Sequence, residues 1–203
     1  MRDLEIRGAG NILGAEQHGH MEAVGYDLYC KLLNEAVSVL KGTAKEDENF
    51  ETVVDCDIDA YIPPSYIKNE YQKLDIYKRI SGIETEDEYM DMQDELIDRF
   101  GDIPRPVENL LRVAELKAMA HRCYVTEIDI NRQEIRISMY PKAKLDTSGI
   151  PDLIKKYRGD LKMQTGPTPG FVYLDQRNRN KDCERMIEKA KEVLGELAGM
   201  AGG

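Results

Sequence analysis

The spacing of apolar residues predicts helices over much of the first two thirds of the chain. Apolar residues recur every three or four positions, the period of an amphipathic helix, in residues 21–41, 65–80, 85–100 and 106–122. A Thr-Glu-Asp-Glu sequence at the start of the third stretch predicts a capping box between Thr85 and Glu88. Gly42 and Gly101 stand where two of these helices are expected to end.

Other segments alternate between apolar and polar residues, and this period of two predicts strands. The first covers about residues 54–60, where three aspartates alternate with apolar residues until Pro63 and Pro64 end the pattern. Further strands are expected over residues 125–130, 134–140, 161–164 and 171–175, with a tight hairpin at Asn-Arg-Gln between the first two. Helices are expected over 148–157 and 181–197. Because strands come in hairpins and helices in a block, this order predicts an α+β fold with a mostly antiparallel sheet and a block of helices.

A short polar segment divides the chain. Residues 43–49 are charged and lack apolar periodicity, so we interpret them as a linker. The predicted organisation is a loop-and-helix appendage over residues 1–42, the linker, and one domain over residues 50–203.

The net charge of the chain indicates which kinds of partner it can bind. The chain carries a formal net charge of -10, and residues 1–100 hold 23 Asp and Glu against 10 Lys and Arg. A polyanion such as duplex DNA is bound mainly through Lys and Arg, so this acidic chain is expected to be a poor general DNA binder and better suited to a basic protein partner. The chain shows no apolar run long enough to span a membrane, and no C-x-x-C pair, so we expect a cytoplasmic protein with reduced core thiols.

The opening segment is rich in glycine but matches no nucleotide-binding loop. No G-x-x-x-x-G-K-[ST] sequence is present, and the spacing of Gly8, Gly10 and Gly14 departs from G-x-G-x-x-G. We therefore predict no catalytic residues in this chain and no hydrolysis of ATP by it alone. Arg2, Arg7 and Gln17 are the polar groups of interest in this loop.

The aspartates of the first predicted strand allow two interpretations. Asp55, Asp57 and Asp59 are expected on one strand face, where three carboxylates suit Mg²⁺ or Ca²⁺. A metal-dependent hydrolase is therefore an alternative function. The other interpretation is a solvated strand face, because no further ligand or general base is evident, and no metal site is assigned.

The helix over residues 85–100 carries a stripe of carboxylates. Glu95, Asp98 and Arg99 stand at i, i+3 and i+4, so they share one exposed edge. This edge is either an ordinary solvated face or a surface that receives a basic patch of another protein.

Several of these segments together resemble one family. The segment RDLEIRGAGNILGAEQHG resembles the translocation motif of RecG-like helicases and of bacterial transcription-repair coupling factors. Three further segments resemble the coupling-factor family specifically. They are EAVGYDLYCKLLNEAV, IDAYIPPSYIKNEYQKLDIYKRI and ELIDRFGDIPRPVENLL. These segments cover roughly residues 2–120.

The resemblance implies a C-terminal part of a superfamily 2 DNA translocase. ATP and Mg²⁺ would be bound by motor domains upstream, with no cofactor in this chain. Residues matching Arg7 and Gln17, with Arg2 beside them, would couple ATP hydrolysis to movement on duplex DNA. The parent protein would act on stalled RNA polymerase in transcription-coupled nucleotide excision repair.

The resemblance also implies a regulatory role for the acidic helix. In the family, the segment ELIDRFG docks onto an N-terminal repair module of the same protein and masks the surface that binds the damage-recognition ATPase UvrA. That role falls on Glu95, Asp98 and Arg99 here. A basic cluster at Arg177, Arg179 and Lys181 is either a contact to DNA phosphates or an ordinary surface loop.

Overall fold

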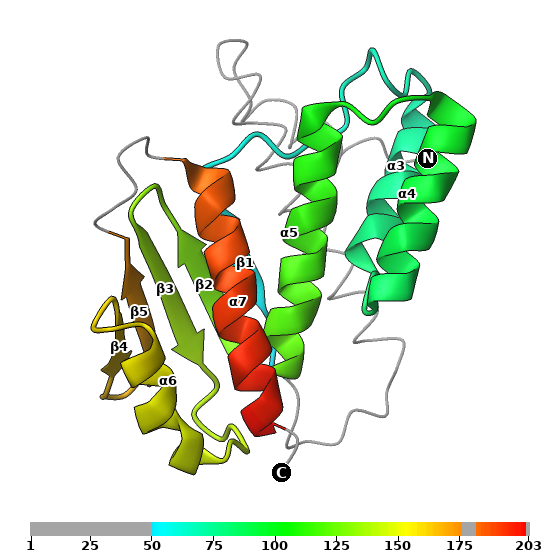
Figure 1. Ribbon diagram of the computed structural model, residues 1–203. Coiled ribbons are helices and arrows are strands. Elements are labelled where there is room, and N and C mark those ends of the chain that lie inside the picture. The colour runs from blue at the N-terminus through cyan, green and yellow to red at the C-terminus, as the bar shows by residue number, and fades with distance from the viewer. Residues whose placement is uncertain (1–49, 176–181, 202–203) are drawn as a thin grey trace, which may run out of the picture.

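The computed structural model describes residues 50–175 and 182–201. They contain a five-stranded sheet with strand order β1-β2-β3-β5-β4 (Figure 1). The strands are β1 (Val53–Cys56), β2 (Val125–Ile130), β3 (Glu134–Met139), β4 (Leu161–Gln164) and β5 (Gly170–Leu174). Only β1 and β2 pair in parallel, and the remaining neighbours are antiparallel. The predicted α+β fold with a mostly antiparallel sheet is confirmed.

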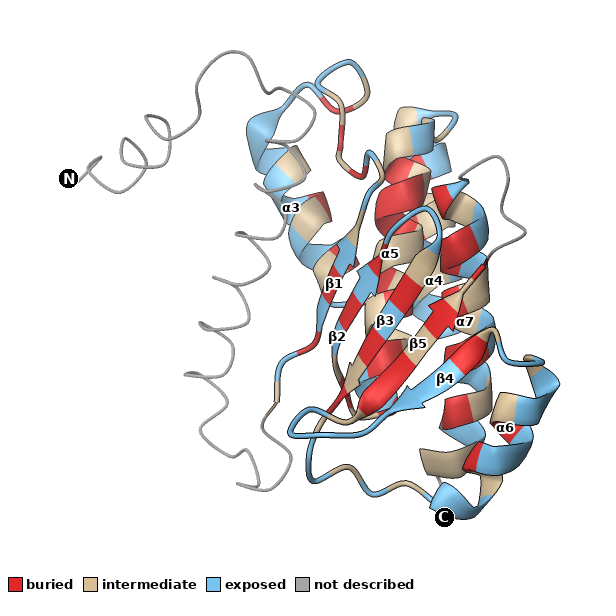
Figure 2. Ribbon diagram, turned by 90° about the vertical axis from the view of Figure 1, so that its left-hand side faces the viewer, coloured by how far each residue is buried: buried red, intermediate tan, exposed pale blue. Residues whose placement is uncertain are grey.

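The helices are α3 (Glu70–Ser81), α4 (Glu86–Phe100), α5 (Arg105–Arg122), α6 (Ile150–Lys156) and α7 (Cys183–Ala201), with a short 3₁₀ turn at Thr147–Gly149. Helices α5, α6 and α7 pack against one face of the sheet, whereas α3 and α4 pack against α5. In Figure 1, α5 stands between α7 and the α3–α4 pair. Figure 2 shows the opposite face of the sheet without a covering helix among the described residues. The predicted appendage over 1–42, the linker over 43–49 and the helix over 21–41 lie outside the described residues.

Two apolar clusters share helix α5. The first lies between the sheet and α7 and includes Leu116, Ile128 and Leu194, each fully buried. The second lies between α5 and the α3–α4 pair and includes Ile76, Leu96 and Leu110, also fully buried. One side of α5 therefore supports the sheet, while its other side carries the pair of helices that holds the acidic stripe.

The first strand is shorter than predicted. It ends at Cys56, because its neighbour β2 ends at the paired residue Ile130 and offers no further ladder. The Asp57 N–H still donates to the Ile130 carbonyl, and the Ile58 N–H then donates back to Cys56 in a tight turn. Beyond this turn the alternation of buried and exposed residues continues, but Ala60 packs into the helical cluster and not onto the sheet.

The helix predicted from residue 65 begins later. Asn69 is its N-cap, with the side-chain oxygen accepting a hydrogen bond from the Gln72 N–H at 3.1 Å. The preceding residues form a turn in which the N–H groups of Tyr66 and Ile67 donate to the carbonyl of Pro63. At the other end of the domain, α7 begins at Cys183 and continues to Ala201, past the predicted end at residue 197.

Two local predictions are confirmed in detail. The Glu88 N–H donates to the Thr85 hydroxyl at 3.2 Å, and the Glu88 carboxylate accepts from the Thr85 N–H, so the capping box is formed. Between β2 and β3, the Asn131 side-chain oxygen accepts from the N–H groups of Gln133 and Glu134, which closes the tight hairpin. Among the described helices none is long and apolar enough to cross a membrane.

Candidate docking edge on the α3–α4 pair

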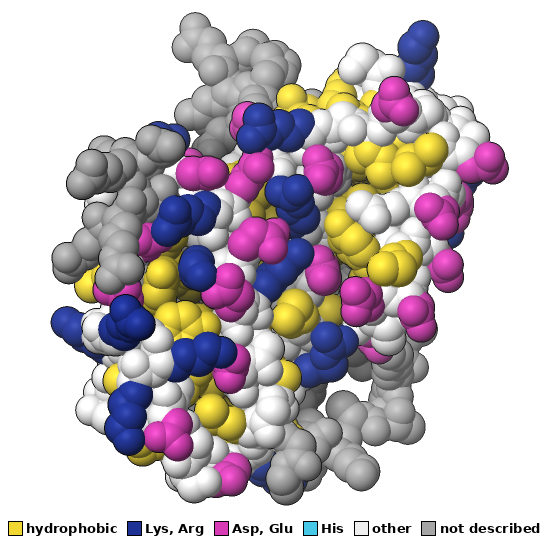
Figure 3. Space-filling model, viewed as in Figure 1, with side chains coloured by type: hydrophobic (Ala, Val, Ile, Leu, Met, Phe, Trp, Pro, Cys, Tyr) yellow, Lys and Arg dark blue, Asp and Glu magenta, His cyan; other side chains and the backbone are white. Residues whose placement is uncertain are grey.

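Helix α4 is a firmly bounded helix with one apolar and one acidic side. The capping box fixes its first turn, and Gly101 ends it with a φ of 84°, a conformation that favours glycine. Met92 and Leu96 face the helical cluster and are buried. The carboxylates of the stripe point outward, and in Figure 3 acidic side chains gather over the α3–α4 side of the molecule.

Glu95, Asp98 and Arg99 lie on one exposed edge of α4, as predicted from their spacing. Glu95 is half-buried, with 27% of its side chain exposed, whereas Asp98 and Arg99 are exposed. Arg99 donates from Nη1 to the Glu95 Oε1 atom at 2.6 Å, and its guanidinium carbon lies 4.9 Å from the centroid of the Phe100 ring. These contacts hold Arg99 along the helix it belongs to.

A residue that the sequence did not indicate completes this edge. Arg79, in the last turn of α3, donates from Nη1 to Glu95 Oε1 at 2.6 Å and from Nη2 to Glu95 Oε2. Two parallel bonds between a guanidinium and a carboxylate make a bidentate pair, which is the most directional form of ion pair. The only sequence signal for this pair is a basic residue at the C-terminus of α3, where the helix dipole favours it.

The two arginines change the charge that the edge presents. Hydrogen bonds from Arg79 and then from Arg99 hold the pKa of the Glu95 carboxyl at about 2, well below its ordinary value. Glu95 is therefore ionised at any physiological pH but already neutralised by its partners. Asp98 has no ion-pair partner among the described residues, so it remains a free negative charge beside them.

The aspartates of the first strand do not form a metal site. Asp57 pairs with Arg132 through Oδ2 at 3.1 Å, and Asp57 and Asp59 lie beyond the end of β1. In the described part of the chain no three His, Cys, Asp or Glu side chains gather in a way that suits a metal ion. The described residues therefore do not support the hydrolase interpretation, because the alternation that suggested one strand face continues through a turn.

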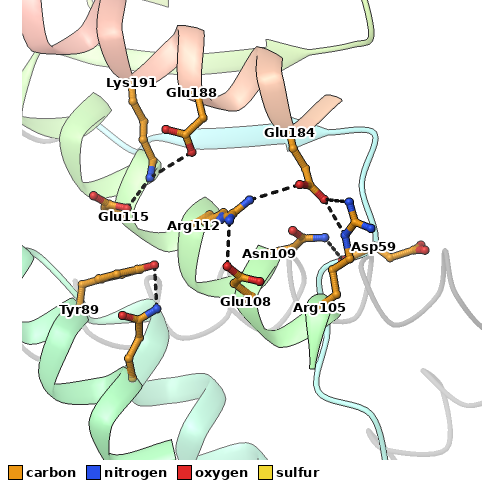
Figure 4. A network of polar contacts seen from close by, with 11 residues as sticks. Asp59, Tyr89, Arg105, Glu108, Asn109, Arg112, Glu115, Glu184, Glu188 and Lys191 are labelled. Carbon is orange, nitrogen blue, oxygen red and sulfur yellow. Dashed lines mark hydrogen bonds and ion pairs between the residues drawn. The ribbon is translucent and has the colours of Figure 1, made fainter. Parts of the chain in front are cut away.

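A second polar network joins α5 to α7 (Figure 4). Glu184 at the start of α7 accepts from Arg105 Nε at 2.8 Å and lies 3.5 Å from Arg112 Nη1. Farther along, Lys191 of α7 donates to Glu115 of α5 at 2.6 Å. These ion pairs are partly exposed, so we expect each to contribute at most about 1 kcal/mol.

Two of the four cysteines lie in the core of the described residues. Cys123 and Cys183 are buried, and burial raises the pKa of both thiols to about 11. Both thiols are therefore protonated at neutral pH, which makes them poor nucleophiles.

His121 lies in an aromatic cluster at the end of α5. Its ring stacks on Phe50 with centroids 4.6 Å apart, and Phe50 also stacks on Tyr140 at 4.9 Å. The Thr52 hydroxyl donates its only hydrogen to the Val125 carbonyl at 2.7 Å. The contact of 3.0 Å between Thr52 Oγ1 and His121 Nδ1 is therefore donated by the imidazole, which fixes the tautomer.

We expect this cluster to make stability depend on pH. Partial desolvation lowers the pKa of His121, which remains partly exposed to solvent, so the unfolded chain takes up this proton at a higher pH than the folded chain. The stabilising effect is complete above the ordinary histidine pKa of about 6.5 and is lost as pH falls through the lower, folded value. Nuclear magnetic resonance titration of the His121 ring should give a pKa below 6.5. Chemical denaturation gives the free energy of unfolding at pH 5 and at pH 8. The difference between these two values should be smaller for His121→Gln than for the wild type. An unchanged pH dependence would contradict this role.

The other residues predicted to be functional lie outside the described residues. They are Arg2, Arg7 and Gln17 of the proposed motor-coupling loop and Arg177, Arg179 and Lys181 of the basic cluster. Their assigned roles stay predictions.

Comparison with known proteins identifies the domain. Residues 56–150 match the family model described as the TRCF domain. The chain is 46% identical to the transcription-repair-coupling factor of Bacillus subtilis (strain 168) over 202 residues, covering 98% of this chain and 17% of that protein. It is 45% identical to the same factor of Staphylococcus haemolyticus (strain JCSC1435) over 150 residues, covering 73% of this chain and 13% of that protein.

A solved structure agrees with these relatives. The crystal structure of the C-terminal domain of a transcription-repair coupling factor superimposes with a TM-score of 0.60 at 26% identity, covering 74% of this chain and 95% of that one. The chain thus spans about a sixth of the length of the Bacillus relative it matches. The chain belongs to the transcription-repair coupling factor family, and its described residues have the fold of that family's C-terminal domain.

Proposed function

We propose that this chain is a regulatory docking module of a transcription-repair coupling factor. In this account the edge formed by Glu95, Asp98 and Arg99 binds the N-terminal repair module of the same protein in the resting state. Docking there masks the surface that would otherwise bind UvrA. Release follows when the motor engages RNA polymerase and duplex DNA.

The observation that carries this proposal is the convergence of the three residues on one exposed edge of a capped helix. Helix α4 is bounded by its capping box and by Gly101, and its inner side is anchored by buried Met92 and Leu96. The backbone of α4 therefore keeps its position before a partner arrives, which lowers the ordering cost of binding. The excess of carboxylates around it favours a basic partner surface.

The remainder of the function belongs to the parent protein. We propose that the parent is an ATP-driven DNA translocase whose motor domains bind ATP and Mg²⁺, and that Arg2, Arg7 and Gln17 couple that motor to movement. The relatives that support this proposal are about six times as long as the chain, and they carry the name transcription-repair-coupling factor.

Removal of the Glu95 carboxylate should weaken docking. We expect Glu95→Ala to reduce the affinity of the chain for the separately produced N-terminal repair module about tenfold, a typical loss for one central charged contact. Isothermal titration calorimetry measures this directly. Glu196→Ala is the matched control, because Glu196 is also a half-buried helical glutamate in an ion pair, here with Lys156. Equal affinities for Glu95→Ala and the wild type would show that the docking edge is misplaced.

A further inference from the structure

We propose that Arg79 is a built-in competitor for the docking partner and that it lowers the affinity of the docking edge. The inference rests on the proposed function of that edge. The partner group that fits is a cationic side chain of the repair module, and Arg79 occupies the carboxylate that this cation would bind.

The Glu95 carboxylate has little capacity left to accept hydrogen bonds. A carboxylate has about four lone-pair directions for hydrogen bonds. Arg79 uses one on each oxygen, and Arg99 uses a second on Oε1. A partner cation that approaches Glu95 therefore finds most of the carboxylate already bonded and meets two guanidinium groups of its own sign.

The two arginines that bind Glu95 differ in how firmly they are held. Arg99 is on the same helix as Glu95, four residues on, and its guanidinium also lies near the Phe100 ring. It can orient Glu95 while a partner binds. Arg79 comes from α3 and has 41% of its side chain exposed, so its pair with Glu95 is open to solvent and easily exchanged.

Arg79 has a second possible acceptor in Asp75. Asp75 stands one turn earlier on α3 and, after Glu95, contributes to raising the pKa of Arg79. Residues at i and i+4 on a helix lie side by side, so a displaced Arg79 guanidinium can move to the Asp75 carboxylate. The edge then has two arrangements, one closed by Arg79 and one in which the partner cation takes its place.

Competition by Arg79 predicts that removing Arg79 tightens docking, whereas removing either of its acceptors weakens it. Removing Arg79 frees Glu95 and deletes a like charge beside the incoming cation, so Arg79→Gln should tighten docking about fivefold. Arg79→Lys, which keeps the charge but loses the bidentate fork, should fall between Arg79→Gln and the wild type. Asp75→Asn removes the second acceptor and should weaken docking. Glu95→Ala should weaken it as well.

The test measures dissociation constants of these variants for the N-terminal repair module at two salt concentrations. Arg136→Gln is the control, since it removes one positive charge from an exposed ion pair on the sheet face that no described helix covers. We also expect Arg79→Gln to lower the thermal stability of the chain, because it breaks a contact between α3 and α4. Tighter docking together with lower stability separates competition from a purely structural role.

The outcomes distinguish this inference from the function it rests on. If Arg79→Gln weakens docking or leaves it unchanged while Glu95→Ala weakens it, the competitor role is wrong and the docking edge stands. If neither Glu95→Ala nor Arg79→Gln changes the affinity, the docking edge itself is wrong.

Discussion

Replacing Gly170 by alanine should be among the most destabilising single changes in this domain. Gly170 opens β5 and pairs with Ser138 of β3 and Gln164 of β4. A Cβ atom at this position would lie 2.0 Å from the Ile137 carbonyl oxygen, and that oxygen belongs to the backbone of the neighbouring strand. No rotamer relieves this contact, so β5 must move away from β3.

We expect Gly170→Ala to lower the free energy of unfolding by about 3 kcal/mol or more, because overpacking against backbone is costlier than against side chains. Chemical denaturation measures the loss. Gly195→Ala is the matched control: it makes the same change in helix α7, where the new methyl group meets nothing within 4 Å besides its chain neighbours and the nearby backbone of its own helix, and it should stabilise by about 0.5–1 kcal/mol. Similar stabilities for Gly170→Ala and wild type would contradict the close approach of β3 and β5.

The second large effect is expected at Leu110, in the cluster that holds α3 and α4 against α5. Leu110 is fully buried, and Leu→Ala changes at such sites cost about 2–5 kcal/mol. Leu116→Ala provides a matched comparison, since Leu116 is equally buried on the same helix but belongs to the sheet cluster. The two variants remove the same atoms from different cores.

Native-state hydrogen exchange separates the two cores. We expect Leu110→Ala to reduce amide protection chiefly in α3 and α4, and Leu116→Ala chiefly in the sheet and α7. Leu110→Ala should also weaken docking, because the cluster that Leu110 shares with Met92 and Leu96 holds α4, and with it the docking edge, in position. A uniform loss of protection in both variants would show that the two clusters unfold as one unit.

The parts of this fold that local spacing determines were predictable from the sequence. The capping box of α4 and the Asn131 turn each depend on residues a few positions apart, and both appear as predicted. The edge of Glu95, Asp98 and Arg99 is of the same kind, since helical geometry alone places i, i+3 and i+4 together.

Long-range pairing set the features that the sequence did not predict. The first strand stops at Cys56 because β2 stops at Ile130, and no local signal at Asp57 reports where a distant strand ends. The Arg79–Glu95 contact depends on how α3 and α4 align side by side, which the apolar period of either helix leaves open. For the same reason, the sequence did not show that Asp57 and Asp59 lie beyond the end of β1, apart from the strand face that holds Asp55.

The central claim is that the acidic edge of α4 is a docking surface for the repair module of the parent protein. The most direct measurement is a nuclear magnetic resonance titration of the isotope-labelled chain with the unlabelled N-terminal repair module. Our account predicts that the amide signals of Glu95, Asp98, Arg99 and Arg79 change, while signals from the sheet face opposite α5 and α7 stay unchanged. No change anywhere, or changes confined to the sheet, would contradict it.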